Sequence, residues 1–283
     1  MVSRIVVIGG GFAGLWAAAA AARARTEFGL DDRIAVTVIA PDGFHVIRVR
    51  CYETDLSALR VPLDDVLGPI GVHRRAGRAI DIDPAARTVT VESAAPSGGV
   101  DTLAYDRLIL SPGIDIMSDT LPGLAKPGAQ DKVLHAWKAG AQTVALRKQL
   151  ESMPANGTFV ISIPLAPYRC PPGPYERICQ VAHYFKQAKP NAKIIVLDAN
   201  PDIQSKKGLF LASWNGQYKG MIDYRPNSEV KAVDARARTV RTDFETVIGN
   251  VLNVLPPMRA ANLAIDMGLA EGNGRWCEVD WLT

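Results

Sequence analysis

Residues 4–14 read Arg-Ile-Val-Val-Ile-Gly-Gly-Gly-Phe-Ala-Gly, and this stretch decides the fold. The β-branched run at residues 4–8 predicts a short strand that stops at the glycines. The Ala-rich stretch from residue 15 to about residue 24 favours a helix. A second β-branched run at residues 34–39 predicts another strand, which ends at a turn. Together these elements form a βαβ unit, the arrangement of a parallel, doubly wound sheet.

The spacing of the glycines predicts a dinucleotide site. Gly9 permits the tight turn, Gly11 lets the backbone approach a pyrophosphate, and Gly14 lets the helix pack closely on the strand. The start of the helix, with Phe12 and Ala13, presents N–H groups without helical partners and a partial positive charge to the phosphates. The alternative is a glycine-rich turn that holds no ligand.

A carboxylate that accepts the ribose hydroxyls is missing from its usual place. Dinucleotide sites usually carry Asp or Glu at the end of the second strand. Here that position is Ala40, and Asp42 follows two residues later. Either Asp42 takes over this contact or the ribose has no carboxylate partner, and both possibilities stay open.

The composition restricts the class of protein. The chain has 283 residues, 48% of them hydrophobic, which suits two globular domains. A net charge of +3 and the lack of a dense Lys/Arg tract argue against a nucleic-acid or membrane-surface protein. Four cysteines in a chain of this length exclude a disulfide-stapled mini-domain. No apolar stretch approaches the ~20 residues of a membrane span, and the early glycines interrupt any signal peptide.

The same order of elements occurs twice along the chain, without a strict sequence repeat. Each module has a strand, a helix, a strand, an antiparallel hairpin and a final strand. We therefore predict an α/β fold with two Rossmann-like modules, residues 1–113 and 114–257, and a return segment, residues 258–283. The predicted strands are residues 4–8, 34–39, 79–83, 88–91 and 105–110, then 158–163, 193–197, 230–233, 239–242 and 251–255, with a helix at 174–186.

The second module has a proline loop in place of the glycine turn. Residues 164–174 read Pro-Leu-Ala-Pro-Tyr-Arg-Cys-Pro-Pro-Gly-Pro. Proline lacks an N–H donor, so this loop cannot surround a pyrophosphate with backbone amides, which argues against a nicotinamide dinucleotide here. A stiff loop suits holding one side chain, Cys170, and the neighbouring Arg169 cation favours the nucleophilic thiolate. The alternative is a buried, inert cysteine.

The remaining cysteines and the histidines give weaker signals. Cys179 lies in a predicted helix beside apolar residues, which favours core packing. Cys277 is assigned no role. The spacing of Cys170 and Cys179 resembles no zinc pattern, and the four histidines are dispersed, so no metal site is predicted.

Five segments carry a family likeness. They are His-Ala-Trp-Lys-Ala-Gly at residues 135–140, Leu-Arg-Lys-Gln-Leu at 146–150, Tyr-Arg-Cys-Pro-Pro-Gly-Pro-Tyr-Glu-Arg at 168–177, Leu-Asp-Ala-Asn-Pro at 197–201 and Gly-Arg-Trp-Cys at 274–277. They resemble the flavoprotein subunit of flavocytochrome c sulfide dehydrogenase, from about residue 111 to the last residues. The first hundred residues are similar to the wider group of flavoproteins with two dinucleotide-binding domains, and residues 44–50 look closer to type II NADH dehydrogenases.

This resemblance implies FAD on the first module, oxidation of sulfide, and transfer of electrons to a separate c-type cytochrome subunit, in the periplasm. Cys170 matches one of a pair of redox-active cysteines, so that sulfide attacks a disulfide and two electrons reach the flavin through the thiolate. Glu176 matches an acidic residue that handles protons, although it can instead complement a helix dipole.

The resemblance also implies further contacts with the cofactor. Cys51 matches a cysteine that tethers the flavin covalently, and a structural cysteine is the alternative. Pro257 lies in a loop that resembles one passing near the isoalloxazine ring. Pro112 and Gly113, which follow the last strand of the first module, are further candidates for cofactor contacts.

The family has more sequence after the equivalent of Cys277, including a Gly-Asp turn and a domain with the second redox cysteine. We therefore expect a fragment, a recombined reading frame or a degenerate relative, in which Cys170 lacks its partner unless Cys179 or Cys277 takes that place. The likeness also allows a sulfide:quinone reductase or a cytoplasmic NADH:quinone reductase. A non-catalytic flavin-binding protein is the alternative from another class.

Overall fold

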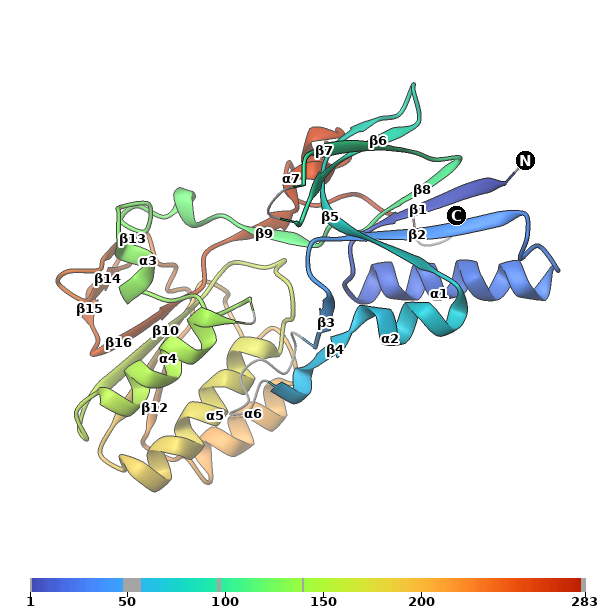
Figure 1. Ribbon diagram of the computed structural model, residues 1–283. Helices are drawn as coiled ribbons and strands as arrows, with labels where there is room; N and C mark the ends of the chain where they lie inside the picture. The colour runs from blue at the N-terminus through green and yellow to red at the C-terminus, as the bar shows by residue number, and fades with distance from the viewer. Residues whose placement is uncertain (1, 48–56, 96–97, 139, 281–283) are drawn as a thin grey trace. The chain divides into compact units, whose positions relative to one another are not determined.

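A computed structural model describes residues 2–47, 57–95, 98–138 and 140–280. Within these residues the chain divides into two compact units. The first unit contains residues 2–47, 57–115 and 260–280, and the second contains residues 116–138 and 140–259. Each unit has its own sheet with parallel strands (Figure 1), which confirms the predicted α/β fold with two Rossmann-like modules. Cys51 lies outside the described residues.

The first unit is built on a sheet of six strands: β1 (Ser3–Ile8), β2 (Ile34–Ala40), β5 (His73–Asp83), β6 (Thr88–Ser93), β7 (Val100–Ala104) and β8 (Arg107–Leu110). Their order is β7-β6-β5-β2-β1-β8. β1 pairs in parallel with both β2 and β8, and β2 pairs in parallel with β5. β6 pairs antiparallel with both β5 and β7, and its pairing with β5 confirms the first predicted hairpin.

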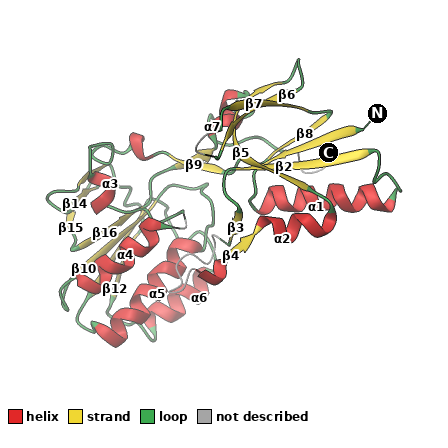
Figure 2. Cartoon of the chain, viewed as in Figure 1, coloured by secondary structure: helices red, strands yellow, loops and turns green. Residues whose placement is uncertain are grey.

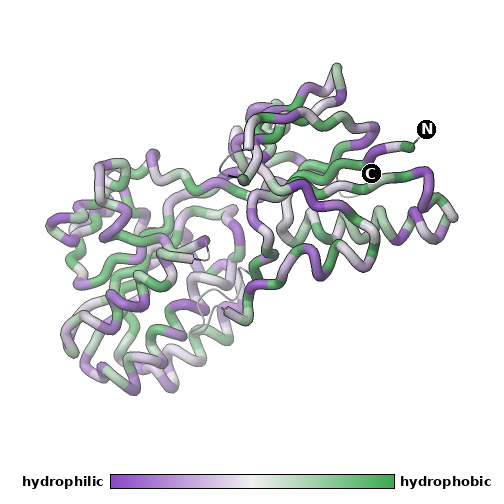
Figure 3. Tube along the Cα trace, in the orientation of Figure 1, coloured by the Kyte–Doolittle hydropathy of each residue, from purple (hydrophilic) through white to green (hydrophobic). Residues whose placement is uncertain are grey.

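Apolar side chains cover both faces of this sheet. On one face, α1 (Phe12–Glu27) and α2 (Leu63–Leu67) pack against β1 and β2, with Ala18, Val38 and Leu63 in one buried cluster. On the other face, Ile8 and Val89 lie in a cluster that α7 (Asn262–Asp266) covers. Figure 3 shows hydrophobic residues along the central strands and hydrophilic residues at the turns. The short elements are β3 (Phe44–Val46), β4 (Arg60–Pro62) and the 3-10 helices η2 (Ser57–Leu59) and η3 (Gly68–Ile70).

The second unit is built on four parallel strands: β10 (Thr158–Ile163), β11 (Lys193–Asp198), β12 (Ile222–Arg225) and β16 (Val251–Val254). The order is β12-β11-β10-β16. A separate antiparallel sheet contains β13 (Ala232–Asp234), β14 (Thr239–Arg241) and β15 (Thr246–Ile248), which confirms the second predicted hairpin. The helices are η4 (Ser118–Thr120), α3 (Ala129–Lys132), α4 (Ala141–Ser152), α5 (Gly173–Ala188) and α6 (Lys207–Asn215), and Figure 2 draws helices in red.

Helix α5 forms because its apolar residues recur at helical spacing. Ile178, Val181, Ala182 and Phe185 are buried and lie on one face, while the polar residues between them are more exposed. Pro174 stands in the first turn, where its missing N–H costs no helical hydrogen bond. The helix therefore starts directly after the proline loop and fixes the end of that loop.

The parallel strands of the two units have the same order. The parallel strands lie in the order β5-β2-β1-β8 in the first unit and β12-β11-β10-β16 in the second. Numbered along the chain, this order is third, second, first and fourth in both units. Between its third and fourth parallel strands, each unit forms antiparallel strands. The order reverses between β1 and β8 and between β10 and β16. Ligands of doubly wound sheets bind outside the carboxyl ends of the strands at this reversal. The glycine turn after β1 and the proline loop after β10 both occupy that position.

The observed bounds differ from the predicted ones for local reasons. α1 begins at Phe12 rather than at residue 15 because Gly11 is its N-cap residue, so Gly14 lies inside the helix. β8 begins at Arg107 rather than at residue 105, because the N–H of Tyr105 donates to the carbonyl oxygen of Arg87 and not to a strand of the parallel sheet.

Two short strands connect the units. β9 (Ile114–Ile116) and β17 (Met258–Ala260) form a two-stranded sheet. The unit boundaries fall inside these strands, after Asp115 and after Arg259.

Candidate functional site

Two of the three motif glycines Gly9, Gly11 and Gly14 are required by close backbone contacts. Gly9 has φ +110°, and a Cβ atom there would lie 2.1 Å from the carbonyl oxygen of Ser111. A Cβ atom on Gly14 would lie 1.8 Å from the carbonyl oxygen of Gly9. Side chains do not fit at either position, so these glycines hold the turn against β8 and the start of α1.

Gly11 has open space around it instead. No heavy atom lies within 4 Å of the position where its Cβ would stand, and Gly11, Phe12 and Ala13 are exposed. The first N–H groups of α1 have no acceptor within the helix and face the space at the carboxyl edge of the sheet. An anionic group can approach this backbone closely, and the helix dipole favours it. The turn therefore fits the pyrophosphate of a dinucleotide such as FAD.

His45 supports the glycine turn, and sequence reasoning missed this role. Its Nδ1 lies 3.0 Å from the carbonyl oxygen of Gly10, and because that oxygen only accepts, Nδ1 carries the hydrogen. Its ring meets the Phe12 ring edge to face, with centroids 4.5 Å apart. His45 follows β2 closely in the chain, so the short β3 strand brings it back to the turn.

The other predicted cofactor residues of the first unit lie at the same edge of the sheet. Ala40 ends β2 and is buried, whereas Asp42 is exposed in the turn that follows. Pro112 and Gly113 follow the carboxyl end of β8, next to Ser111, which contacts the glycine turn. Pro257 lies in the second unit, where its carbonyl oxygen accepts a hydrogen bond from the N–H of Met117 (2.9 Å).

Cys170 lies in the proline loop at the carboxyl edge of the second sheet. Its backbone has φ +97°, a region that residues other than glycine rarely adopt. Its carbonyl oxygen accepts a hydrogen bond from the N–H of Gly173 (2.8 Å), which joins the loop to the first turn of α5. The side chain is half-buried and is a free thiol.

Arg169 favours the Cys170 thiolate, as expected from the sequence, but burial of the thiol outweighs this effect. The Arg169 guanidinium donates to the carbonyl oxygen of Trp137 (2.6 Å) and lies 5.7 Å from the centroid of the Trp137 ring. Burial raises the pKa of the Cys170 thiol, the charge of Glu176 raises it further, and the Gly173 N–H and Arg169 oppose this only in part. The thiol is therefore harder to ionise than an ordinary cysteine, because desolvation outweighs the neighbouring cation.

Glu176 lies in the first turn of α5, as its helix-dipole interpretation requires. It is also close enough to two thiols to raise the pKa of both Cys170 and Cys179. Cys179 is half-buried and accepts a hydrogen bond from Nε1 of Trp214 (3.3 Å). The Glu176 carboxylate in the first turn of α5 thus makes both thiols harder to ionise.

Asp198 occupies the place in the second unit that the ribose carboxylate has in a dinucleotide site. It is the last residue of β11, the second parallel strand of this unit. Its side chain is fully buried, and its Oδ2 accepts hydrogen bonds from the hydroxyls of Tyr175 (2.7 Å) and Tyr224 (3.0 Å). The sequence carried a signal for this residue, because the predicted strand at residues 193–197 ends directly before it.

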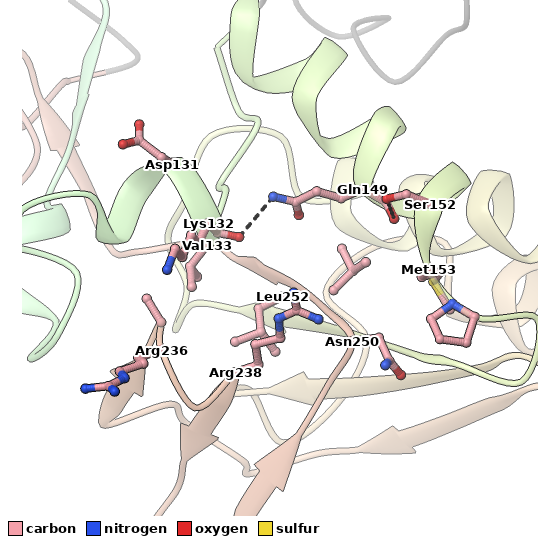
Figure 4. Close-up of a pocket in the computed structure, with 13 residues that line it drawn as sticks. Asp131, Lys132, Val133, Gln149, Ser152, Met153, Arg236, Arg238, Asn250 and Leu252 are labelled. Carbon is pink, nitrogen blue, oxygen red and sulfur yellow. Dashed lines mark hydrogen bonds between the residues drawn. The ribbon is translucent and has the colours of Figure 1, made fainter.

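A cavity of about 320 Å³ lies at the opposite edge of the second sheet (Figure 4). Pro154 and Asn250, which line it, precede β10 and β16, whereas the proline loop follows β10. The cavity therefore does not belong to the candidate site. In the part of the chain that the structure describes, no group of three or more His, Cys, Asp or Glu residues is placed to hold a metal ion. Among the described helices, none is both long and apolar enough to cross a membrane.

Comparison with protein families agrees with this geometry. Residues 3–161, more than half of the chain, match the family described as Pyridine nucleotide-disulphide oxidoreductase. The chain belongs to this family. Residues 143–256 match a second description, the central part of the sulfide dehydrogenase [flavocytochrome c] flavoprotein chain. The expected relationship to the wider group of flavoproteins with two dinucleotide-binding domains is confirmed at the level of this family.

Individual members of the family are similar to parts of the chain. An NADH dehydrogenase-like protein of Mycobacterium tuberculosis is 47% identical over 127 residues, which are 44% of this chain and 30% of that protein. The fold is similar to sulfide:quinone oxidoreductase of Aquifex aeolicus, with a TM-score of 0.75, 18% identity, and coverage of 97% of this chain and 63% of that one. A pyridine nucleotide-disulfide family oxidoreductase of Enterococcus faecalis gives a TM-score of 0.69 and 15% identity, covering 98% and 57%. The chain thus spans less than two thirds of these relatives.

Proposed function

We propose that this pyridine nucleotide-disulphide oxidoreductase family member binds FAD and oxidises sulfide, with a c-type cytochrome subunit as electron acceptor. The observation that carries the proposal is the conformation of Cys170. A non-glycine residue at φ +97° costs about 1–3 kcal/mol and persists only where the surrounding structure enforces it. The fold maintains a thiol in this strained position, at the edge of a doubly wound sheet where ligands bind. The match of residues 143–256 to the sulfide dehydrogenase flavoprotein chain supports the choice of substrate.

FAD would be held by the first unit. The glycine turn, the exposed start of α1 with Gly11, Phe12 and Ala13, and Asp42 at the same edge provide phosphate and ribose contacts. Bound flavin supplies the two-electron acceptor that no side chain of the protein can provide. Covalent attachment through Cys51, and contacts from Pro112, Gly113 and Pro257, belong to the same proposal.

Cys170 is proposed to form an S–S bond with sulfide, giving a persulfide on Cys170; the two electrons released would pass to bound FAD, and Glu176 would accept the proton of the thiol. The pKa of the Cys170 thiol is raised by burial and by Glu176, so ionisation of the thiol needs a nearby base when it reacts. The charge of Glu176, in the first turn of α5, acts on the thiol and raises its pKa, which supports this role. The thiol and carboxylate belong to one rigid segment, because the loop and helix are joined through the Gly173 N–H.

NADH oxidation is the second candidate function, favoured by the names of the Mycobacterium tuberculosis relatives. Two features of the second unit support sulfide over NADH. The loop after β10 contains prolines where a pyrophosphate needs N–H donors. Asp198, at the ribose position, is fully buried and already accepts hydrogen bonds from protein groups. A nicotinamide dinucleotide would lack both usual contacts there.

The test is to add sulfide, without oxygen, to the full chain loaded with FAD and to follow the flavin absorbance. We expect bleaching by sulfide and not by NADH, followed by reduction of added c-type cytochrome. Cys170→Ser should abolish the bleaching and keep the flavin, whereas Cys277→Ser, at an exposed cysteine, should bleach normally. Bleaching by NADH alone would establish the second candidate, and failure to retain flavin would indicate a non-catalytic protein. Acid precipitation of wild type and Cys51→Ser tests the covalent bond.

A further inference from the structure

We propose that Asp198 is a positioning residue that clamps the proline loop and so holds the Cys170 thiol in its half-buried, strained position. Whether that thiol reacts with sulfide rests on the proposed function, but the clamp itself does not. In a dinucleotide site the carboxylate at the end of the second strand accepts ribose hydroxyls. Here the same position is used to fix a loop of the protein.

One oxygen of Asp198 fixes the end of the loop. Oδ2 accepts hydrogen bonds from the hydroxyl of Tyr175 (2.7 Å) and the hydroxyl of Tyr224 (3.0 Å). Tyr175 is fully buried in the first turn of α5, two residues after the Gly173 N–H that holds the carbonyl oxygen of Cys170. The hydrogen bond between Tyr175 and Asp198 therefore fixes the first turn of α5, which directly follows the loop.

The other oxygen of Asp198 fixes the beginning of the loop through Asn200. Oδ1 accepts hydrogen bonds from the backbone N–H of Asn200 (2.9 Å) and from its Nδ2 (2.8 Å). The oriented amide of Asn200 then accepts from the N–H of Ala166 (2.9 Å) and donates to the carbonyl oxygen of Pro164 (3.0 Å). Asp198 thus connects both ends of the loop that contains Cys170.

The carboxylate is fully occupied by these contacts. Asp198 has no exposed surface, and four donors from Tyr175, Tyr224 and Asn200 surround its two oxygens. A buried carboxylate without such donors would be strongly unfavourable, so the donors and the acid need one another. The same enclosure leaves no oxygen for a nucleotide ribose. The second unit has exchanged ribose recognition for anchoring of the thiol loop.

The clamp can be tested by the reactivity of the thiol, which requires neither sulfide nor flavin. The probe is iodoacetamide, and peptide mass spectrometry gives the alkylation rate of Cys170, with the exposed Cys277 as internal standard. Releasing the loop exposes Cys170 to water, so its rate at neutral pH should rise about tenfold and the midpoint of its pH profile should fall, because burial raises the pKa of this thiol. A role limited to global stability would leave this midpoint unchanged in folded protein.

Four variants make the test decisive. Asp198→Ala removes all four contacts and should have the largest effect. Asp198→Asn should have an intermediate effect, because its amide oxygen can still accept from the Asn200 donors whereas both tyrosine hydroxyls must reverse to accept from the new NH2 group. Tyr175→Phe removes one of the four contacts of Asp198, together with the acceptor of the Gln204 N–H, and keeps the ring. Asp202→Asn, an exposed acid in an ion pair with Lys207, is the matched control and should resemble wild type.

An unchanged Cys170 rate and midpoint in both Asp198→Asn and Tyr175→Phe would overturn the proposal. If Asp198→Ala does not fold, Tyr175→Phe still decides, since it leaves the carboxylate with three donors. Altered alkylation in a protein whose flavin ignores sulfide would refute the proposed function and keep the clamp. Bleaching of the flavin by sulfide, together with unaltered alkylation of Cys170 in the variants, would support the proposed function and refute the clamp.

Discussion

Replacing Gly11 with alanine separates the role of the glycine turn in binding from its role in folding. Gly14→Ala is the matched comparison, because both residues belong to the same motif and both changes add one methyl group. The structure treats the two positions differently. A methyl group on Gly11 meets no heavy atom within 4 Å, whereas a methyl group on Gly14 would lie 1.8 Å from the carbonyl oxygen of Gly9.

The free energies of unfolding of the two variants should therefore differ. Gly11 has φ −82° and ψ −173°, which alanine adopts freely, so the gain from a stiffer unfolded chain and the weaker N-cap nearly cancel, within about 1 kcal/mol. At Gly14 the obstacle is backbone and also Oγ of Ser111 at 2.9 Å, so α1 must move away from the strand. Overpacking of this kind costs about 1–3 kcal/mol or more.

Flavin content and thermal unfolding of the purified variants provide the assay. We expect Gly11→Ala to unfold at nearly the wild-type temperature without flavin but to lose most bound FAD, because its methyl group occupies the space that the pyrophosphate needs. Gly14→Ala should unfold at a clearly lower temperature whether or not flavin is added. A Gly11→Ala protein with wild-type flavin content would refute the assignment of this turn as the pyrophosphate site.

Three further outcomes follow from buried groups. Alkylation of Cys170 by iodoacetamide in wild-type protein should have a pH midpoint above the ordinary thiol value of 9.0, and a lower midpoint would contradict its desolvation. Burial lowers the pKa of His135 from 6.5 to about 4, so the neutral imidazole contributes up to roughly 3 kcal/mol to the free energy of unfolding. This contribution is complete above pH 6.5 and disappears as the pH falls towards 4. In His135→Gln, the melting temperature should therefore depend less on pH in this window. Lys189→Met should lower the free energy of unfolding by about 2 kcal/mol in urea titrations, because its ammonium group donates to the carbonyl oxygens of Glu151 and Met153 at the end of α4, while Lys186→Met serves as control.

The elements of the fold were predictable where the sequence pattern is local. The glycine motif placed a strand, a turn and a helix correctly, because Gly9 and Gly14 are required by close backbone contacts within this short segment and with Ser111 after β8. The order of the strands was not given by the pattern. Pairing of β1 with β8, about a hundred residues apart, depends on packing of both sheet faces.

Two hairpin turns, one in each unit, share a short sequence pattern that was not predicted to be a repeat. Residues 83–89 read Asp-Pro-Ala-Ala-Arg-Thr-Val and residues 234–240 read Asp-Ala-Arg-Ala-Arg-Thr-Val. Each aspartate accepts a hydrogen bond from the N–H three residues later, and Arg87 and Arg238 both have positive φ, 53° and 55°. The two hairpin turns are therefore built in the same way. A residue-by-residue comparison of the two modules detects the repeat only in these turns.

The electrostatics of the candidate site were the least predictable part. Proximity of Arg169 to Cys170 in the sequence suggested a stabilised thiolate, but the guanidinium is directed to Trp137 and burial decides the pKa. The two tyrosine hydroxyls that donate to Asp198 come from residues 23 and 26 positions away. Burial and long-range hydrogen bonds depend on the complete packing, so no local pattern reports them.

The chain leaves the first unit at β9 and returns to it at β17, so the first unit can be completed only after the second has been synthesised. The N–H of Met117 donates to the carbonyl oxygen of Pro257, and the N–H of Ala261 donates to that of Gly113, so the polypeptide leaves and re-enters the first unit at neighbouring points. All six strands of the first sheet are synthesised before residue 111, but Leu263 and Met267, which cover one face of that sheet, emerge about 150 residues later. During that interval the entire second unit is synthesised while one apolar face of the first sheet is uncovered. A nascent chain that stops before residues 263–267 have been made is therefore the species most exposed to aggregation.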